Sequence, residues 1–314
     1  MNFNRLIIII NLAGLLFMGT APRSLGQYIF TTLNDPSGTN GTQVFGISGG
    51  NFVGTYTDGS SVSHGFLYNG SSYTTLDDPL SVGSTNVYGI SGSNIVGAYD
   101  TGGGTSQGFI YNGSTYTTLS DPLATSTTKA FGVSGSTVVG AYIQGFSQHG
   151  FLLNGSTYTT LDVPSGAFTT PFGVSGSNVV GFYVGGDSLQ HGFIYNGSSY
   201  TTLDDPLGVN GTLLTGISGS NIVGSYYDGS DVSHGFLYNG TTFTTIDDPS
   251  GVQGSSLFGI SGTTLVGAYL DGNGTNNGFE ATLTPEPSSL ALLSLGLFLL
   301  GLAGRFRSSL AALR

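Results

Sequence analysis

Short runs of alternating apolar and polar residues recur along the chain, with Gly-rich turns between them. Residues 64–79, HGFLYNGSSYTTLDDP, contain two such runs joined by an Asn-Gly pair, which favours the positive φ angles of tight hairpins. Lightly altered copies begin at Gln107, His149, His191 and His234. The pattern therefore predicts one β-hairpin that has been copied along the whole chain.

A second hairpin pattern lies between the copies of the first, for example YGISGSNIVGAY from Tyr88. Its first Gly stands at positions 46, 89, 132, 173, 216 and 259, so the repeat is 41 or 43 residues long. Four predicted strands in a repeat of this length are typical of a propeller blade.

The register of the second hairpin follows from its turn. If Gly92 and Ser93 form a two-residue turn, Ile90 lies opposite Ile95. By the same count Tyr88 lies opposite Gly97, so that an aromatic ring covers a strand glycine.

The count of strand types predicts how the fold closes. The second hairpin occurs six times, but the YTTLDDP strand occurs six times only if residues 28–36, YIFTTLNDP, are included. No such strand follows Phe279. We therefore predict an all-β fold, a six-bladed β-propeller over residues 27–283, whose last blade is completed by the N-terminal strand. A β-solenoid or another closed repeat is the alternative.

The composition excludes several classes of function. The chain has no Cys, so it has no disulfides and no thiolate metal site. Only 7% of its residues are charged, against roughly 25% in ordinary soluble domains. All 17 acidic residues lie between residues 27 and 287, where Lys129 is the only cation. A body this acidic repels phosphate, so we expect no nucleic-acid partner.

Residues 1–26 have the pattern of a secretory signal peptide. Arg5 precedes an apolar run over residues 6–18, and small residues surround candidate cleavage points after Ala21 and near Gly26. An N-terminal membrane anchor is the alternative, but the apolar run is shorter than the roughly 20 residues that a spanning helix needs.

Residues 284–314 contain a short motif, an apolar stretch and a basic tail in this order. Pro285, Glu286 and Pro287 precede an apolar stretch over residues 290–303, predicted to be a transmembrane helix, and a basic tail with Arg305 and Arg307. This arrangement resembles the PEP-CTERM sorting signal of Gram-negative bacteria. The resemblance implies export by the Sec machinery, transient retention at the inner membrane, and cleavage by an exosortase. A C-terminal anchor that stays in place is the alternative. Residues 28–283 also resemble HAF-type extracellular repeats, with HGF in place of HAF.

The four histidines occupy one position of the repeat. The equivalent residues of the other two repeats are Gln107 and Asn277. A ring of His would suit a metal, but replacement by Gln and Asn favours a hydrogen-bonding structural role. The residues concerned are His64, His149, His191 and His234.

Pairs of Asp precede Pro in several repeats. Adjacent carboxylates on a strand point to opposite faces and cannot share a proton as a catalytic dyad does, so we assign Asp78, Asp205 and Asp248 to turns. The loops that hold Asp228, Asp231 and Asp271 offer oxygen ligands for Ca²⁺, although without EF-hand spacing. We expect no other cofactor.

The third repeat departs most from the others. It carries Phe146, Phe168 and Pro171, and Lys129 is expected to stand alone in a loop before it. Loop aromatics on a rigid scaffold can stack on sugar rings, but we expect local packing here.

These features together favour a non-enzymatic binding or structural module at the cell surface or in the extracellular matrix, among exopolysaccharides of a biofilm. The alternative is a secreted glycosidase or lyase. A glycosidase needs two opposed carboxylates about 5 to 10 Å apart. Glu280 is the only acidic residue outside the turns and the sorting motif, and it has no evident partner, so no catalytic residue is expected.

Overall fold

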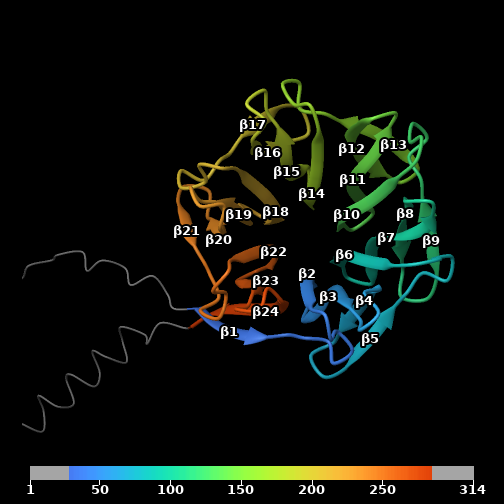
Figure 1. The fold of residues 1–314 in the computed structure, drawn as a ribbon. Helices are drawn as coiled ribbons and strands as arrows, with labels where there is room; N and C mark the ends of the chain where they lie inside the picture. Colours follow the sequence, from blue (N-terminus) through green and yellow to red (C-terminus); the bar gives the residue numbers. More distant parts are fainter. Residues whose placement is uncertain (1–27, 285–314) are drawn as a thin grey trace, which may run out of the picture. The chain divides into compact units, whose positions relative to one another are not determined.

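The computed structural model describes residues 28–284, of which Tyr28–Leu283 form one compact unit. Its 24 strands form six antiparallel four-stranded sheets arranged in a ring (Figure 1). This confirms the predicted all-β, six-bladed β-propeller. No helix among residues 28–284 is long and apolar enough to cross a membrane. The predicted signal peptide and the C-terminal helix with its basic tail lie outside the described residues.

The strands of each blade are numbered from the centre of the ring outwards, except in the last blade. The innermost strands are β2 (Thr42–Ser48), β6 (Thr85–Ser91), β10 (Thr128–Ser134), β14 (Thr169–Ser175), β18 (Thr212–Ser218) and β22 (Ser255–Ser261). The second strands are β3 (Asn51–Thr57), β7 (Asn94–Gly102), β11 (Thr137–Gln144), β15 (Asn178–Val184), β19 (Asn221–Tyr227) and β23 (Thr264–Leu270). The third strands are β4 (Ser63–Tyr68), β8 (Thr105–Tyr111), β12 (Ser147–Asn154), β16 (Gln190–Tyr195), β20 (Ser233–Tyr238) and β24 (Asn276–Leu283). The outermost strands are β5 (Tyr73–Leu76), β9 (Tyr116–Leu119), β13 (Thr157–Leu161), β17 (Tyr200–Thr202), β21 (Phe243–Thr245) and β1 (Tyr28–Thr32).

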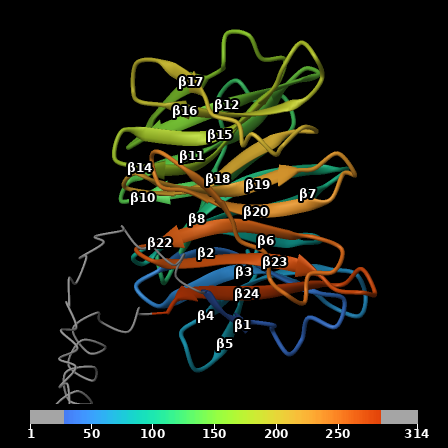
Figure 2. The same ribbon diagram turned by 90° about the vertical axis from the view of Figure 1, so that its left-hand side faces the viewer.

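The connections lie on two opposite faces of the ring, because the strands run from one face to the other (Figure 2). Tight turns such as β2–β3 and β4–β5 lie on one side, which we call the turn face. Loops such as β3–β4 and the connections between blades lie on the other side, which we call the loop face.

The hydrophobic core lies between neighbouring blades. Val53 of the first blade packs with Val87 and Phe109 of the second, and all three side chains are fully buried. The third strand of every blade contributes a fully buried Phe at the position of Phe109. The repeat therefore buries one aromatic ring per blade in the same place, and no blade has a complete core without its neighbour.

The last blade is closed by the first strand of the chain. β1 pairs with β24 in antiparallel register, with Tyr28 opposite Leu283 and Thr32 opposite Phe279. Phe30 packs against Phe279 with their ring centroids 5.6 Å apart. The predicted closure by the N-terminal strand is thus confirmed.

A β-bulge interrupts each innermost strand. In the second blade, Ile90 pairs with Ile95 as predicted, but Gly97 lies opposite Val87 and not opposite Tyr88. The predicted cover of Gly97 by Tyr88 is therefore wrong, because the bulge leaves Tyr88 unpaired. The ring of Phe109 covers this glycine instead, since a Cβ at Gly97 would lie only 2.7 Å from it.

Candidate ligand site in the central channel

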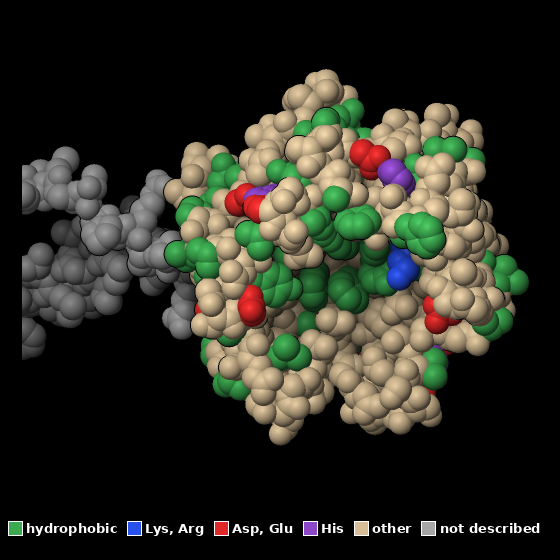
Figure 3. Space-filling view, turned by 45° about the horizontal axis from the view of Figure 1, so that its top comes forward, with side chains coloured by type: hydrophobic (Ala, Val, Ile, Leu, Met, Phe, Trp, Pro, Cys, Tyr) green, Lys and Arg blue, Asp and Glu red, His purple; other side chains and the backbone are tan. Residues whose placement is uncertain are grey.

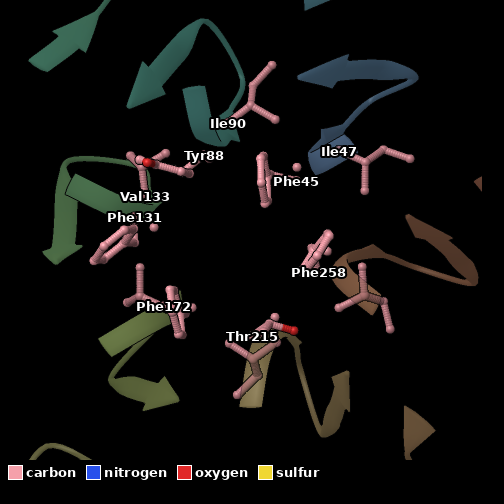
Figure 4. A pocket seen from close by; sticks show the side chains of 18 of the residues that line it. Phe45, Ile47, Tyr88, Ile90, Phe131, Val133, Phe172, Thr215 and Phe258 are labelled. Carbon is pink, nitrogen blue, oxygen red and sulfur yellow. The ribbon is translucent and has the colours of Figure 1, made fainter. Parts of the chain in front are cut away.

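The bulged residues form a ring around the propeller axis. Because a bulge leaves its residue out of the ladder and re-aims the side chain, the six residues point into the channel (Figure 4). Five are aromatic, and four pairs of neighbours have ring centroids 4.8 to 5.4 Å apart. We call this set the axial ring: Phe45, Tyr88, Phe131, Phe172, Thr215 and Phe258.

Thr215 breaks the aromatic series in the fifth blade. Its hydroxyl donates to the carbonyl of Leu257 at 2.7 Å, with the carbonyl of Val223 at 3.2 Å as a second acceptor. A side chain this small leaves space where the other blades place an aromatic ring. The channel has a volume of about 230 Å³.

Aliphatic side chains form a second layer on the turn-face side of the axial ring. Each lies two residues after a ring member, and the intervening glycines let the innermost strands approach closely: a Cβ at Gly132 would lie 2.2 Å from the carbonyl oxygen of Phe172. The layer consists of Ile47, Ile90, Val133, Val174, Ile217 and Ile260. The channel is therefore lined mainly by apolar groups.

Tyr88 is the one ionisable side chain in this lining, all of which lies within residues 28–284. Burial, with a smaller effect of the negative charge of Asp100, raises the pKa of Tyr88 to about 12. Tyr88 therefore stays a neutral phenol at physiological pH. The lining contains no Asp, Glu or His.

The residues at the mouth of the channel differ from blade to blade. They precede each axial-ring member by two positions, at the loop-face end of the innermost strands: Gln43, Asn86, Lys129, Thr170, Leu213 and Ser256. Gln43 and Asn86 line a polar pocket of about 160 Å³ that also touches Phe45 and Tyr88. Lys129 was expected in a loop, and that expectation is wrong: it lies on β10, opposite Ala141 of β11.

Each of the four histidines is paired with a carboxylate of its own blade on the loop face. In each of these blades Nδ1 lies 2.7 or 2.8 Å from Oδ2 of an Asp thirteen residues later, and the ring stacks on a Tyr of the second strand, as His64 does on Tyr56. The pairs are His64–Asp77, His149–Asp162, His191–Asp204 and His234–Asp247. In the sixth blade, Asn34 donates to Asn277 at 2.8 Å in the same place.

The second Asp of each pair has a different structural role from the first. Asp78, Asp205 and Asp248 are buried, and each accepts a hydrogen bond from the backbone N–H two residues later. This closes an Asx turn at the connection between blades. Burial raises the pKa of Asp205, although the bond from Leu207 acts in the opposite direction.

The three candidate calcium ligands already accept hydrogen bonds, two of them from their own loops and one from a neighbouring loop. Asp228 accepts bonds from the backbone N–H groups of Ser230 and Val232, and Asp271 accepts the equivalent pair in its loop. Asp231 accepts a bond from Asn210 at 2.7 Å. Within residues 28–284, no three His, Cys, Asp or Glu side chains are grouped as metal ligands. Calcium binding stays a prediction.

The aromatic departures of the third repeat lie at the surface. Phe146 is fully exposed at the tip of the β11–β12 turn, and Phe168 is 41% exposed. Pro171 lies on β14, at the bulge before Gly173. Neither Phe lines the channel.

The sequence pattern contained a signal for the axial ring, but we interpreted it as a contact within the blade. The aromatic before each GISG or GVSG motif was assigned to covering a glycine, whereas it lines the channel. The replacement of that aromatic by Thr215 in one repeat out of six was the visible sign of a special position.

Comparison with known proteins gives one family match and several similar folds. Residues 283–308 match the model of the PEP-CTERM protein-sorting motif. No curated protein matches the chain. The resemblance to HAF-type repeats stays a prediction.

The similar solved structures are propellers or related folds at low sequence identity. TolB from Acinetobacter baumannii is 10% identical with a TM-score of 0.52, and the match covers 74% of this chain and 64% of TolB. A mutant of the Aleuria aurantia lectin in complex with α-methyl-L-fucoside is 15% identical with a TM-score of 0.48, over 78% and 96% of the two chains. At these identities the likeness concerns the fold. The protein is thus a six-bladed β-propeller that carries a PEP-CTERM protein-sorting motif at residues 283–308.

Proposed function

We propose that the protein is an exported, non-enzymatic binding module of the cell surface or extracellular matrix, which takes one sugar residue of an exopolysaccharide into its central channel. The observation that carries the proposal is the incomplete axial ring. Five aromatic side chains surround the axis, the small Thr215 takes the sixth place, and the channel that they line has a volume of about 230 Å³.

The size and lining of the channel suit a single small ring. Its volume is below the roughly 300 to 1,000 Å³ of pockets for drug-sized ligands. Aromatic faces offer large rigid apolar surfaces to the C–H faces of a sugar. The polar groups at the mouth, among them Gln43 and Asn86, provide donors and acceptors for its hydroxyls.

The absence of acidic groups from the channel lining favours binding over glycoside hydrolysis. A glycosidase uses two carboxylates on opposite sides of the scissile bond. Glu280 lies on β24 between Thr31 and Val266 of the neighbouring strands, outside the channel lining. Burial raises its pKa. An enzyme acting on polysaccharide is the alternative, and it would have to use the loop face.

The sorting motif supports the proposed location. It indicates export and transient anchoring in a membrane before processing. We extend this to a Gram-negative cell, in which the Sec machinery exports the chain and an exosortase cleaves it near Pro285, Glu286 and Pro287. The propeller is then left at the cell surface or in the matrix.

The test is a binding assay of the full chain, purified in mild detergent, against the exopolysaccharide of the producing cell. We expect saturable binding that a soluble hydrolysate of the same polymer competes away. Running the assay with calcium and with chelator decides whether the loops of Asp228 and Asp271 take part. Absence of binding in both conditions would refute the proposed polysaccharide module. Release of reducing ends during incubation would favour the enzyme.

A further inference from the structure

The mouth of the channel is the place where the repeats differ most. The strands around it are nearly copies of one another, yet the six mouth positions hold six different side chains. A position that only supports the fold is expected to hold the same residue type in every blade, as the buried Phe of the third strand does. The variation makes the two sides of the mouth chemically unlike: blade 5 offers Leu213, and blades 2 and 3 offer Asn86 and Lys129.

Lys129 is the only cation among residues 28–284. It is half-buried, and its ammonium forms no salt bridge or hydrogen bond with any residue in this part of the chain. Figure 3 shows the colour of Lys and Arg at the edge of the central hollow and hydrophobic side chains within the hollow. An unpaired cation is therefore placed beside an apolar channel.

The surroundings strengthen this charge as a ligand contact. Two carboxylates of the loop face, Asp121 and Asp162, have other partners, since Asp121 accepts a bond from the backbone of Leu123 and Asp162 binds His149. Near an apolar wall the attraction between opposite charges is less screened than in bulk water. A bond between an ammonium and a carboxylate is also stronger than one between neutral groups.

We infer that the sugar bound in the channel is a uronate, a pyranose that carries a carboxylate, with this carboxylate on Lys129 and the apolar face of the ring against the axial ring. The inference rests on the proposed function and names its ligand class. The acidic body repels a densely charged polyanion. The ligand is therefore a single uronate, terminal or widely spaced along its polymer.

The experiment measures affinity for matched charged and uncharged sugars. The probes are disaccharides with one terminal glucuronate, galacturonate or mannuronate residue, each compared with its methyl ester, which is larger by one methyl group and carries no charge. Calorimetric titration of the full chain is expected to show at least about tenfold tighter binding of one acid than of its ester, as a charge-assisted contact requires. The preference should shrink as salt is added.

Two variants separate a direct contact from an effect of net charge. Lys129→Gln introduces the residue that the first blade holds at this position, so the fold is expected to tolerate it, and the preference for the acid should disappear. Ser93→Asp makes the same change of net charge at an exposed turn-face position and should leave the preference intact.

The outcomes keep the inference and the proposed function apart. Equal binding of acid and ester, or an acid preference that survives in Lys129→Gln, would overturn the uronate inference and leave carbohydrate binding standing. Failure to bind any of the three acids would also overturn it, and the assay against the cell's own exopolysaccharide would then decide the proposed function alone.

Discussion

The Nδ1 atom of His191 lies 2.8 Å from Oδ2 of Asp204, while Nε2 of the same ring lies 3.1 Å from Oδ2 of Asp187. The hydrogen bond to Asp204 is the largest influence on the pKa of His191. Together with Asp187 it raises this pKa above its usual value, against the lowering effect of partial burial. For His64 and His234 burial is the largest single influence and lowers the pKa, but the paired carboxylates together outweigh it.

These pairs predict a stability that depends on pH. Because the pKa of His191 is higher in the folded chain than in the unfolded chain, protonation stabilises the fold. The stabilisation is complete below the unfolded pKa of about 6.5 and is lost as the pH rises through the folded-state pKa. We expect the free energy of unfolding to fall from about pH 6 to about pH 8, by at most about 1 kcal/mol per pair since solvent screens them.

The sixth blade provides the matched variant for this measurement. Replacing His191 and Asp204 together by Asn reproduces the uncharged pair of Asn277 and Asn34. Thermal unfolding at the two pH values should then show a smaller pH-dependent difference than in the wild-type protein. An unchanged difference would mean that other groups cause it.

Gly97→Ala is expected to destabilise the second blade. A Cβ there would lie 2.1 Å from the carbonyl oxygen of Asn86 and 2.7 Å from the ring of Phe109, so strands or rings must move. Overpacking of this kind costs about 1 to 3 kcal/mol, measurable by urea unfolding. Gly186→Ala is the control, because nothing lies within 4 Å of its added Cβ. Equal effects of the two substitutions would contradict the packing argument.

Phe30→Ala is expected to weaken the closure of the ring. Its half-buried side chain packs on Phe279 across the β1–β24 pairing, so its loss should cost about 2 kcal/mol and increase amide exchange in β24. The neighbouring Ile29 is 55% exposed, and Ile29→Ala should cost no more than about 0.5 kcal/mol. If Phe30→Ala left exchange in β24 unchanged, the first strand would not be needed to hold the last blade.

Thr215→Phe is expected to close the channel. The new side chain completes the axial ring with the type of residue that other blades hold, so the propeller should still fold. Binding of the exopolysaccharide should weaken by at least about tenfold, because the ligand loses its space. Thr215→Val keeps the volume and removes only the hydroxyl, so binding should persist. Full binding by Thr215→Phe would move the ligand site away from the channel.

Replacement of Pro285, Glu286 and Pro287 by Ala is expected to block processing. Cell fractionation should find the altered chain in the membrane fraction at its uncleaved mass, whereas the wild-type chain should appear in shortened form outside the inner membrane. The same distribution and mass for both would rule out the predicted cleavage near this motif.

The sequence allowed the architecture to be predicted because the repeat carries its own evidence. Six copies of the Gly-aromatic pattern predicted the number of blades. The strand over Tyr28–Thr32, which stands at the start of the chain and not at its end, predicted the closure. The periodicity also located the histidines at equivalent places. Their partners followed less directly, because the distance between His64 and Asp77 depends on how β4 pairs with β5.

The channel was not predicted, for a physical reason. A strict alternation of faces placed Tyr88 over Gly97, but the bulge between Val87 and Gly89 shifts the register by one residue. Bulges carry no reliable sequence signature here, since the same glycine serves close packing between neighbouring blades. Lys129 was misplaced likewise, because its polarity suggested a loop although the β10 ladder extends to Thr128.

The pairing of Tyr28 with Leu283 joins the two ends of the propeller in one blade. Five blades consist of consecutive strands and can form from one continuous segment each, but β1 is the first strand of the propeller and its partner β24 is the last. Until these two strands pair, the chain is an open arc with an unpaired edge, the kind of edge that invites pairing with other chains. The pairing of β1 with β24 is therefore the step that converts the arc into a ring and removes its free edge.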